Sequence, residues 1–291
     1  MVFKMTNRKA VCQAGRLHNE DACYICDKFA FVIDGATGLY KEKFTPAETD
    51  AQWLAQRTAK LLSEALCDND KEIQDILIDV TDKIYKEYLE QAGREVGEDM
   101  HPSAALHILR VRHGKMEFFG LGDCLTMVEK IDGTIVMIGG HPFHQYLDDR
   151  TIDLMVEISQ KNGISIREAF LSDEVVALLR ENRSYKNKED GYPIYDLTGR
   201  GLNKAKYASF DLDEIVSVAI MSDGFSEMFS VYGIYKTPEE FMKALKSKSL
   251  EELLLKQCDV QNTDMDFNRW PRFKHRDDSA AVFACVMRCD D

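Results

Sequence analysis

The sequence lacks the features expected of a membrane protein or of a disulfide-rich secreted protein. No apolar run approaches the roughly 20 residues that a membrane-spanning helix needs, and the polar segment 1–15 has no signal-peptide core. The 8 cysteines are scattered and form no dense framework. Reduced thiols and a cytoplasmic location are therefore the expectation.

Zinc-binding patterns are also missing. The 7 histidines form no HExxH motif. Cys23 and Cys26 lie an odd number of positions apart in a strand-like stretch, which points them to opposite faces. His141 and His144 have a possible ligand spacing, but they flank a proline in what resembles a loop. We interpret these residues as structural, without a metal role.

The chain has fewer basic than acidic residues. The chain has 37 Lys and Arg against 50 Asp and Glu, a formal net charge of −13. Self-repulsion at this charge disfavours binding to nucleic acid or to anionic membranes. Hydrophobic residues make up 45% of the 291 residues, enough for a sizeable core. We predict a single domain over residues 1–291, and the sequence leaves the oligomeric state open.

The order of predicted elements indicates an α+β protein in which helices pack on antiparallel sheets. Strands are predicted at 22–26, 29–33, 104–112, 116–121, 125–131, 134–138, 207–212, 215–222 and 279–287. Helices are predicted to begin at Thr45-Pro46-Ala47-Glu48, at about residue 69, and at the capping sequences 237–240 and 249–252. The helical and then loop-like stretch 141–206 is interpreted as an insertion between sheet strands.

Acidic residues occupy the ends of several predicted strands. They are Glu20 and Asp21 before the first strand, Asp34 at the end of the second, Asp123 and Asp223 after two later strands, and Asp277 before the last. Acids in loops are common, and Asp-Gly is ordinary turn chemistry. Asp34-Gly35 and Asp223-Gly224 differ from such turns because each ends a long apolar strand.

The register of the first hairpin makes this pattern specific. If residues 27–28 form a two-residue turn, strand partners have numbers that sum to 55, and Asp21 lies opposite Asp34. Like charges at such positions destabilise a sheet, whereas a bound cation would reverse the sign of the interaction. Ligands that are all oxygens suit Mg²⁺ or Mn²⁺. A longer turn would give another register and leave the question open.

Five short motifs together resemble the metal-dependent serine/threonine protein phosphatases of type 2C, in particular the bacterial members. They are Arg16-Leu-His-Asn-Glu20-Asp21, Phe31-Val-Ile-Asp34-Gly35, Gly120-Leu-Gly-Asp123, Met221-Ser-Asp223-Gly224 and Asp277-Asp278-Ser279. They occur in the order found in the family and reach from residue 16 to the last strand. The resemblance implies a four-layer αββα sandwich and hydrolysis of phosphoserine and phosphothreonine in proteins.

The resemblance also implies roles for individual residues. Asp34 would bridge two Mn²⁺ or Mg²⁺ ions, with Asp223 and Asp277 on the first ion and with Glu20 and the Gly35 carbonyl on the second. Asp21 would orient a water that bridges the ions as hydroxide, and Arg16 would bind the phosphate. Asp123, with Asp223, matches the position of a weaker third metal, near Glu227.

Two departures from the family leave alternatives open. Ala36 stands where the family often has a histidine, which removes a proton donor for the leaving group. Pro102-Ser103-Ala104 replaces a small, polar stretch. One alternative is therefore a weak or inactive relative that binds phosphoproteins as a regulatory module. The other is a two-metal phosphoesterase that acts on a non-protein substrate.

Overall fold

The larger sheet is built from strands whose side chains alternate between two covered faces. The structure, a computed structural model, describes residues 2–67 and 70–289. The sheet has the order β2-β3-β4-β5-β9, with β8 paired to β4. The strands are β2 Ala22–Ile25, β3 Phe29–Gly35, β4 Ser103–Arg112, β5 Lys115–Leu121, β8 Tyr195–Asp196 and β9 Lys206–Asp211. Phe31 of β3 packs against helices, while Val32 faces the second sheet, as the two-residue period of a strand requires.

The second sheet has the order β1-β11-β10-β6-β7 and is also antiparallel. Its strands are β1 Val2–Gln13, β6 Leu125–Lys130, β7 Ile135–Gly139, β10 Ile215–Met221 and β11 Ser279–Cys289. The sequence did not predict β1, because its residues are polar and mixed. Its long pairing with the apolar β11 holds it in the sheet instead.

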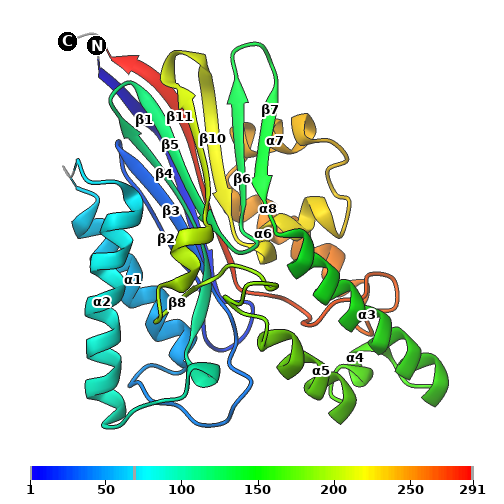
Figure 1. The fold of residues 1–291 in the computed structure, drawn as a ribbon. Helices are drawn as coiled ribbons and strands as arrows, with labels where there is room; N and C mark the ends of the chain where they lie inside the picture. Colours follow the sequence, from blue (N-terminus) through cyan, green and yellow to red (C-terminus); the bar gives the residue numbers. More distant parts are fainter. Residues whose placement is uncertain (1, 68–69, 290–291) are drawn as a thin grey trace.

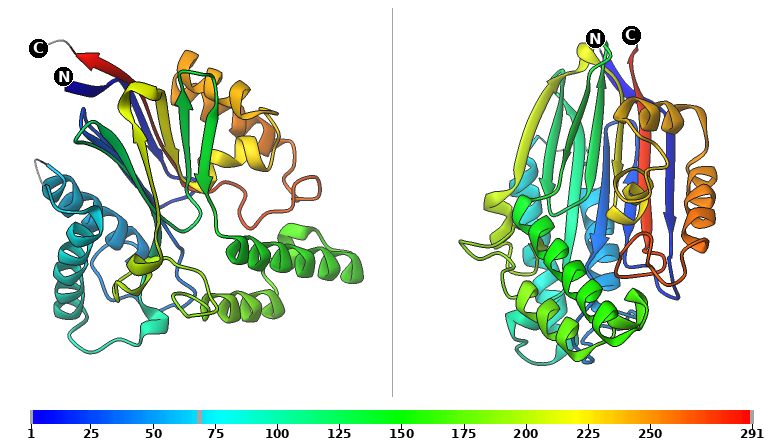
Figure 2. Two further views of the ribbon diagram at one scale, coloured as in Figure 1. Left: turned by 45° about the horizontal axis from the view of Figure 1, so that its top comes forward. Right: turned by 90° about the vertical axis from the view of Figure 1, so that its right-hand side faces the viewer.

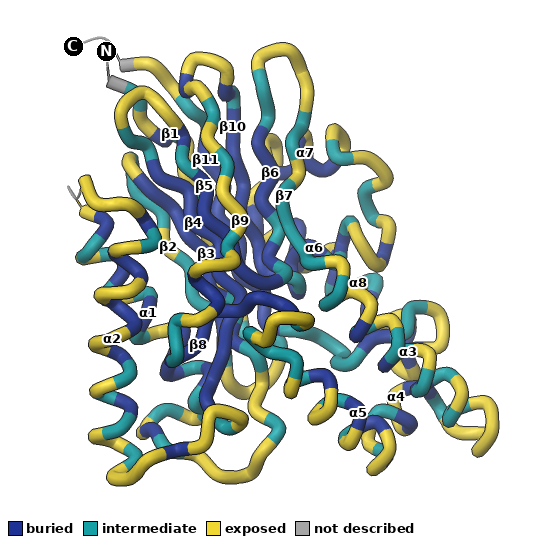
Figure 3. The backbone as a smooth tube through the Cα atoms, in the orientation of Figure 1, coloured by how far each residue is buried: buried dark blue, intermediate teal, exposed yellow. Residues whose placement is uncertain are grey.

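Helices cover the outer faces of both sheets and complete four layers (Figures 1 and 2). The helices α1 Asp50–Ala65 and α2 Ile73–Ala92 pack on the larger sheet, and α6 Asp223–Ser230, α7 Pro238–Ser247 and α8 Leu250–Asn262 pack on the other. A third apolar cluster fills the space between the sheets. Figure 3 shows buried strands between helices whose outer sides are exposed. The expected α+β, four-layer αββα sandwich is confirmed.

Three helices between β7 and β9 project from the end of the sandwich that lies away from the two chain termini (Figures 1 and 2). They are α3 Pro142–Asn162, α4 Ile166–Ala169 and α5 Asp173–Arg183. Short 3₁₀ turns occur at Glu98–Met100, Arg200–Lys204 and Leu212–Glu214. Met155, Ile166 and Phe267 belong to a small apolar cluster at these helices. Among the described helices, none is both long enough and apolar enough to cross a membrane.

Some predicted helix boundaries were wrong. Thr45 does not begin a helix: α1 starts four residues after Pro46, with Thr49 as the N-cap that accepts a hydrogen bond from the Gln52 N–H. The predicted start near residue 69 falls partly outside the described residues, and α2 begins at Ile73. The capping sequences at Thr237 and Ser249 do begin α7 and α8.

The predicted register of the first hairpin is confirmed. Ala22 pairs with Ile33 and Cys23 with Val32, so the paired numbers sum to 55. Asp21 immediately precedes this pairing, and Asp34 immediately follows it. Because side chains alternate along a strand, Asp34 shares the face of Val32, which contacts the cluster between the sheets.

Candidate metal centre

Carboxylates from separate strand ends meet at the end of the sandwich away from the termini. Asp34 ends β3, Asp223 begins α6 directly after β10, and Asp277 precedes β11. The Asp223 N–H donates to Asp34 Oδ2 over 3.3 Å. Asp34 interacts electrostatically with Asp21, Asp123, Asp223 and Asp277. The structure thus brings together acids that lie up to 256 positions apart in the chain (277 − 21).

Burial and mutual repulsion disfavour the ionised form of these carboxyl groups. Burial, followed by the neighbouring carboxylates, raises the pKa of Asp34 well above its ordinary value. Burial does the same for the pKa of Asp21, against a hydrogen bond from Ser222 that lowers it. Burial and the charge of Asp277 raise the pKa of Asp223 to about 7. A group of this kind must bind either protons or a cation.

Gly35 allows the first hairpin to close tightly around Glu20. A Cβ atom at Gly35 would lie 2.4 Å from the Glu20 carbonyl oxygen, so a larger residue cannot occupy this position without a shift. The Thr37 hydroxyl donates to Glu20 Oε2 over 2.5 Å. Within the described chain, Glu20 Oε1 and Asp21 Oδ2 are buried and have no hydrogen-bond partner. Two acceptor atoms are therefore available to a ligand.

Asp278 fixes the loop that carries Arg16. Its two carboxylate oxygens accept hydrogen bonds from the Gly15 N–H at 2.8 Å and from the Glu20 N–H at 2.7 Å. Arg16 itself is exposed, and the described residues include no carboxylate that forms an ion pair with it. An ion pair between Arg16 and Glu20 is therefore not formed.

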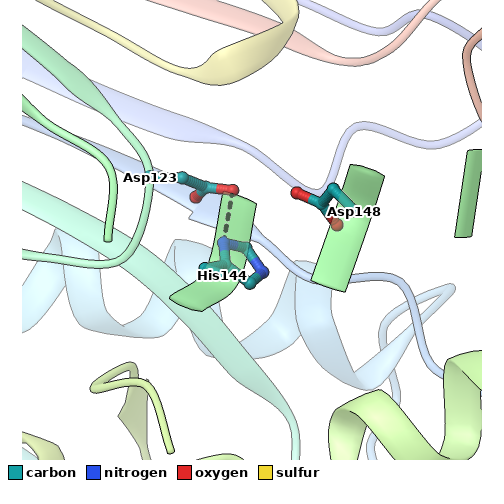
Figure 4. A group of neighbouring side chains, drawn as sticks. All are labelled: Asp123, His144 and Asp148. Carbon is teal, nitrogen blue, oxygen red and sulfur yellow. Dashed lines mark ion pairs between the residues drawn. The ribbon is translucent and has the colours of Figure 1, made fainter. Parts of the chain in front are cut away.

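Asp123 faces two side chains of α3, and this corrects the interpretation of His144 as a loop residue without a role. His144 lies in the first turn of α3, with Nδ1 3.2 Å from Asp123 Oδ2. Figure 4 shows Asp123, His144 and Asp148 pointing toward one another, and one ligand atom from each lies within 4.8 Å of the others. The ring of Tyr192 lies 4.6 Å from the His144 ring. The three side chains could hold a cation.

The charges in this group depend on one another. Burial alone would lower the pKa of His144, but the Asp123 carboxylate outweighs it and raises that pKa to about 9. Burial raises the pKa of Asp148 to about 6. Burial also opposes ionisation of Asp123, yet the charge of His144 lowers the pKa of this carboxyl group overall. The cluster therefore carries more negative than positive charge.

Two further residues belong to the centre. Lys274, which the sequence analysis missed, places Nζ 2.6 Å from Asp277 Oδ1, and no motif or spacing marked it. Glu227 on α6 lies near the centre, as the resemblance implied. Burial, then the charges of Asp223 and Asp277, raise the pKa of Glu227 to about 8. The Tyr232 hydroxyl donates to Glu227 Oε2 over 3.1 Å.

A comparison with models of protein families finds one match over most of the chain. A family model described as "Protein phosphatase 2C" matches residues 10–257. No curated protein matches the chain in sequence.

Similar solved structures include three bacterial phosphatases, at low sequence identity. The Mycobacterium tuberculosis serine/threonine phosphatase PstP is 15% identical, with a TM-score of 0.55, and the match covers 97% of this chain and 98% of that chain. Stp1 from Staphylococcus aureus is 13% identical, with a TM-score of 0.55 and coverage of 97% and 95%. MsPP from Mycobacterium smegmatis is 16% identical, with a TM-score of 0.52 and coverage of 96% and 98%. These likenesses establish the fold.

Proposed function

The chain belongs to the protein phosphatase 2C family, and on this premise we propose that it hydrolyses phosphoserine and phosphothreonine residues of proteins with the help of bound divalent cations. The buried carboxylate cluster is the observation that carries the proposal. Its carboxyl groups have raised pKa values because they are buried together. Such a cluster destabilises the fold unless a bound cation offsets the repulsion between its buried carboxylates.

The residues present fit two Mn²⁺ or Mg²⁺ ions. The donors are all oxygens, which suits these hard cations, and Glu20 Oε1 and Asp21 Oδ2 are buried without a partner among the described residues. We assign Asp34 to both ions, Asp223 and Asp277 to the first, and Glu20 with the Gly35 carbonyl to the second. The catalytic domain of PstP, which is similar in fold, has been solved with two manganese ions.

The chain's own residues would position the substrate around these ions. Divalent cations supply positive charge for the phosphoryl oxygens and make a bound water a nucleophile near neutral pH. Asp21 would orient that water, and the guanidinium of Arg16 would donate two parallel hydrogen bonds to the phosphate. Asp278 keeps the loop of Arg16 in place through the Gly15 and Glu20 amides. Ala36 has no proton to donate to the leaving oxygen.

A weaker third cation is proposed at Asp123. His144 and Asp148 provide two more ligand atoms there, in addition to Asp223, which the family resemblance pairs with Asp123. A cation there would displace the proton of His144, because only a neutral imidazole ligates a metal. An imidazole ligand favours a transition metal such as Mn²⁺ over Mg²⁺.

Substitution of the shared ligand tests the proposed function. Asp34→Asn and Asp223→Asn keep the side-chain shape but remove a negative charge, so we expect each to abolish manganese-dependent cleavage of p-nitrophenyl phosphate. Asp149→Asn, at an exposed carboxylate of α3, is the matched control and should retain activity. Circular dichroism checks that all variants fold, and calorimetry should show weaker manganese binding in the first two. Undiminished activity in both variants would contradict the proposed function.

A further inference from the structure

A cavity of about 400 Å³ opens beside the proposed metal centre. Its lining includes Ala36 and Thr37, which directly follow Gly35. Thr37 is also the residue whose hydroxyl binds Glu20. Other parts of the lining come from α5 and from the segment that follows it, within the region 141–206. We call this space the side cavity. A protein substrate bound at the metal centre would extend past it.

The side cavity carries an excess of positive charge, although the whole chain has a net charge of −13. Within the described residues, five lining cations have no carboxylate partner: Lys41, Lys43, Arg180, Arg183 and Lys188. Three lining carboxylates have no cationic partner: Glu48, Asp50 and Asp99. The remaining lining acids are paired, Glu42 with Arg94, Glu98 with Arg200, and Asp196 with Lys186. Seven Lys and Arg thus line the cavity against six Asp and Glu. Because Glu42 is paired with Arg94 from outside the lining, unpaired cations outnumber unpaired carboxylates by two, on a protein of net negative charge.

Two of the cations are fixed on the loop that leads from the metal centre. Arg183 Nη2 donates to the Thr37 carbonyl at 3.3 Å, and Arg180 Nη2 donates to the Leu39 carbonyl at 3.5 Å. The Arg180 guanidinium also lies over the Tyr40 ring, 5.7 Å from its centroid. A guanidinium has five N–H donors, so each arginine has donors to spare for an anionic ligand. Because their positions are already set, binding costs them little conformational entropy.

We propose that the side cavity binds an anionic group of the substrate protein, either an Asp or Glu side chain near the phosphorylated residue or a second phosphoryl group. The inference rests on the proposed phosphatase function and names the class of substrate that the centre prefers. The excess cations and the adjacency to Thr37 both point to this ligand chemistry. A basic substrate would place like charges together in the cavity, which disfavours binding.

Matched peptides test the inference. Four phosphoserine peptides of one length would carry alanine, glutamate, lysine or a second phosphoserine at the flanking positions. We expect kcat/KM for the glutamate peptide to exceed that for the lysine peptide by at least about tenfold, roughly the effect of one hydrogen bond to a charged group. The preference should shrink as salt is added, because the lysines are exposed to solvent. The doubly phosphorylated peptide distinguishes a carboxylate from a phosphoryl ligand.

Substitution of lysines that line the side cavity tests whether the cavity causes the preference for acidic peptides. Lys41→Ala combined with Lys188→Ala removes two exposed lining cations that fix no part of the loop, and it should bring the ratio of the two kcat/KM values close to one. Cleavage of p-nitrophenyl phosphate, which has no flanking group, should stay unchanged. Lys83→Ala with Lys86→Ala removes the same charge from exposed positions of α2 and should preserve the preference.

The outcomes separate this inference from the proposed function. Hydrolysis without a preference for acidic peptides, or a preference that survives loss of Lys41 and Lys188, would overturn the inference alone. Equal loss of preference in the α2 control would also overturn it, since the effect would then come from overall charge. Absence of hydrolysis for every substrate would overturn the proposed function and, with it, this inference.

Discussion

The buried carboxylates at the strand ends destabilise the fold of the metal-free protein. Asp21 immediately precedes β2 and Asp34 belongs to β3, so both lie at the end of one hairpin, and burial raises the pKa of both. Replacement of such groups by neutral residues often increases the stability of a fold. Their presence therefore indicates selection for a ligand rather than for stability.

His107 gives the fold a pH dependence of its own. It is buried on β4, with Nδ1 2.8 Å from Thr126 Oγ1, and burial lowers its pKa to about 3. In the unfolded chain its pKa is about 6.5, so below that pH the unfolded state takes up a proton that the folded state refuses. The free energy of unfolding is therefore not reduced by His107 well above pH 6.5. It falls as the pH drops below that value, by about 2 kcal/mol at pH 5.

Urea unfolding of His107→Gln measures this effect. We expect the loss of unfolding free energy between about pH 7.5 and about pH 5 to be smaller by about 2 kcal/mol in the variant than in the parent chain. His18→Gln, at an exposed loop position, is the control and should leave the pH dependence unchanged. The same pH dependence in His107→Gln and in the parent would contradict the assignment.

The sequence predicts some site residues and misses others for a physical reason. Asp21 and Asp34 could be paired because hairpin register is local and side chains alternate along strands. His144 could not be placed, because its partner Asp123 becomes a neighbour only through tertiary packing. Lys274 lies three positions before Asp277, but outside any helix or strand, so their spacing alone does not predict the contact. For His144 the sequence does contain one signal for the contact: Pro142 suits the first turn of a helix, which puts His144 and Asp148 on one face.

At the scale of elements, α1 shows how two capping signals compete. Thr45 and Thr49 both precede helical spacing, and the structure uses Thr49, whose side chain accepts from the Gln52 N–H at 3.0 Å. The Thr45 hydroxyl instead donates to Asp50 Oδ1. We expect Thr49→Ala to lower the free energy of unfolding by about 1 kcal/mol through the lost cap.

Thermal or urea unfolding checks this boundary. Pro46→Ala, at an exposed position before the helix, serves as the control and should change stability by no more than about 0.5 kcal/mol. A larger effect from Pro46 than from Thr49 would mean that the helix begins at Thr45 after all.

Elements that the sequence analysis missed are those that depend on distant partners. The polar strand β1 is held by pairing with β11, and α6 begins with Asp223-Gly224, a sequence that also suits a turn. Gly224 is required there because a Cβ atom would lie 2.0 Å from the Asp278 carbonyl oxygen. The packing of helices on antiparallel sheets was predictable from alternation and capping along the chain, whereas the four-layer order was implied by the family resemblance.

At the scale of the whole molecule, the sandwich gathers the acidic ends of several strands into one centre and sets the helices α3 to α5 beside it. The region 141–206 was interpreted as an insertion between sheet strands, and its side chains His144 and Asp148 lie close to Asp123. That position brings both His144 and the arginines of α5 to the neighbourhood of the centre. Substrate selection and metal binding would thus share one region of the molecule.

The dependence of hydrolysis on manganese tests the central claim most directly. The metal-free chain would be titrated with Mn²⁺ while cleavage of p-nitrophenyl phosphate and the heat of binding are both recorded. The account predicts no turnover in excess chelator and a saturable rise in rate that follows the binding of manganese. Turnover that chelator leaves unchanged, or manganese binding without turnover at any concentration, would contradict it.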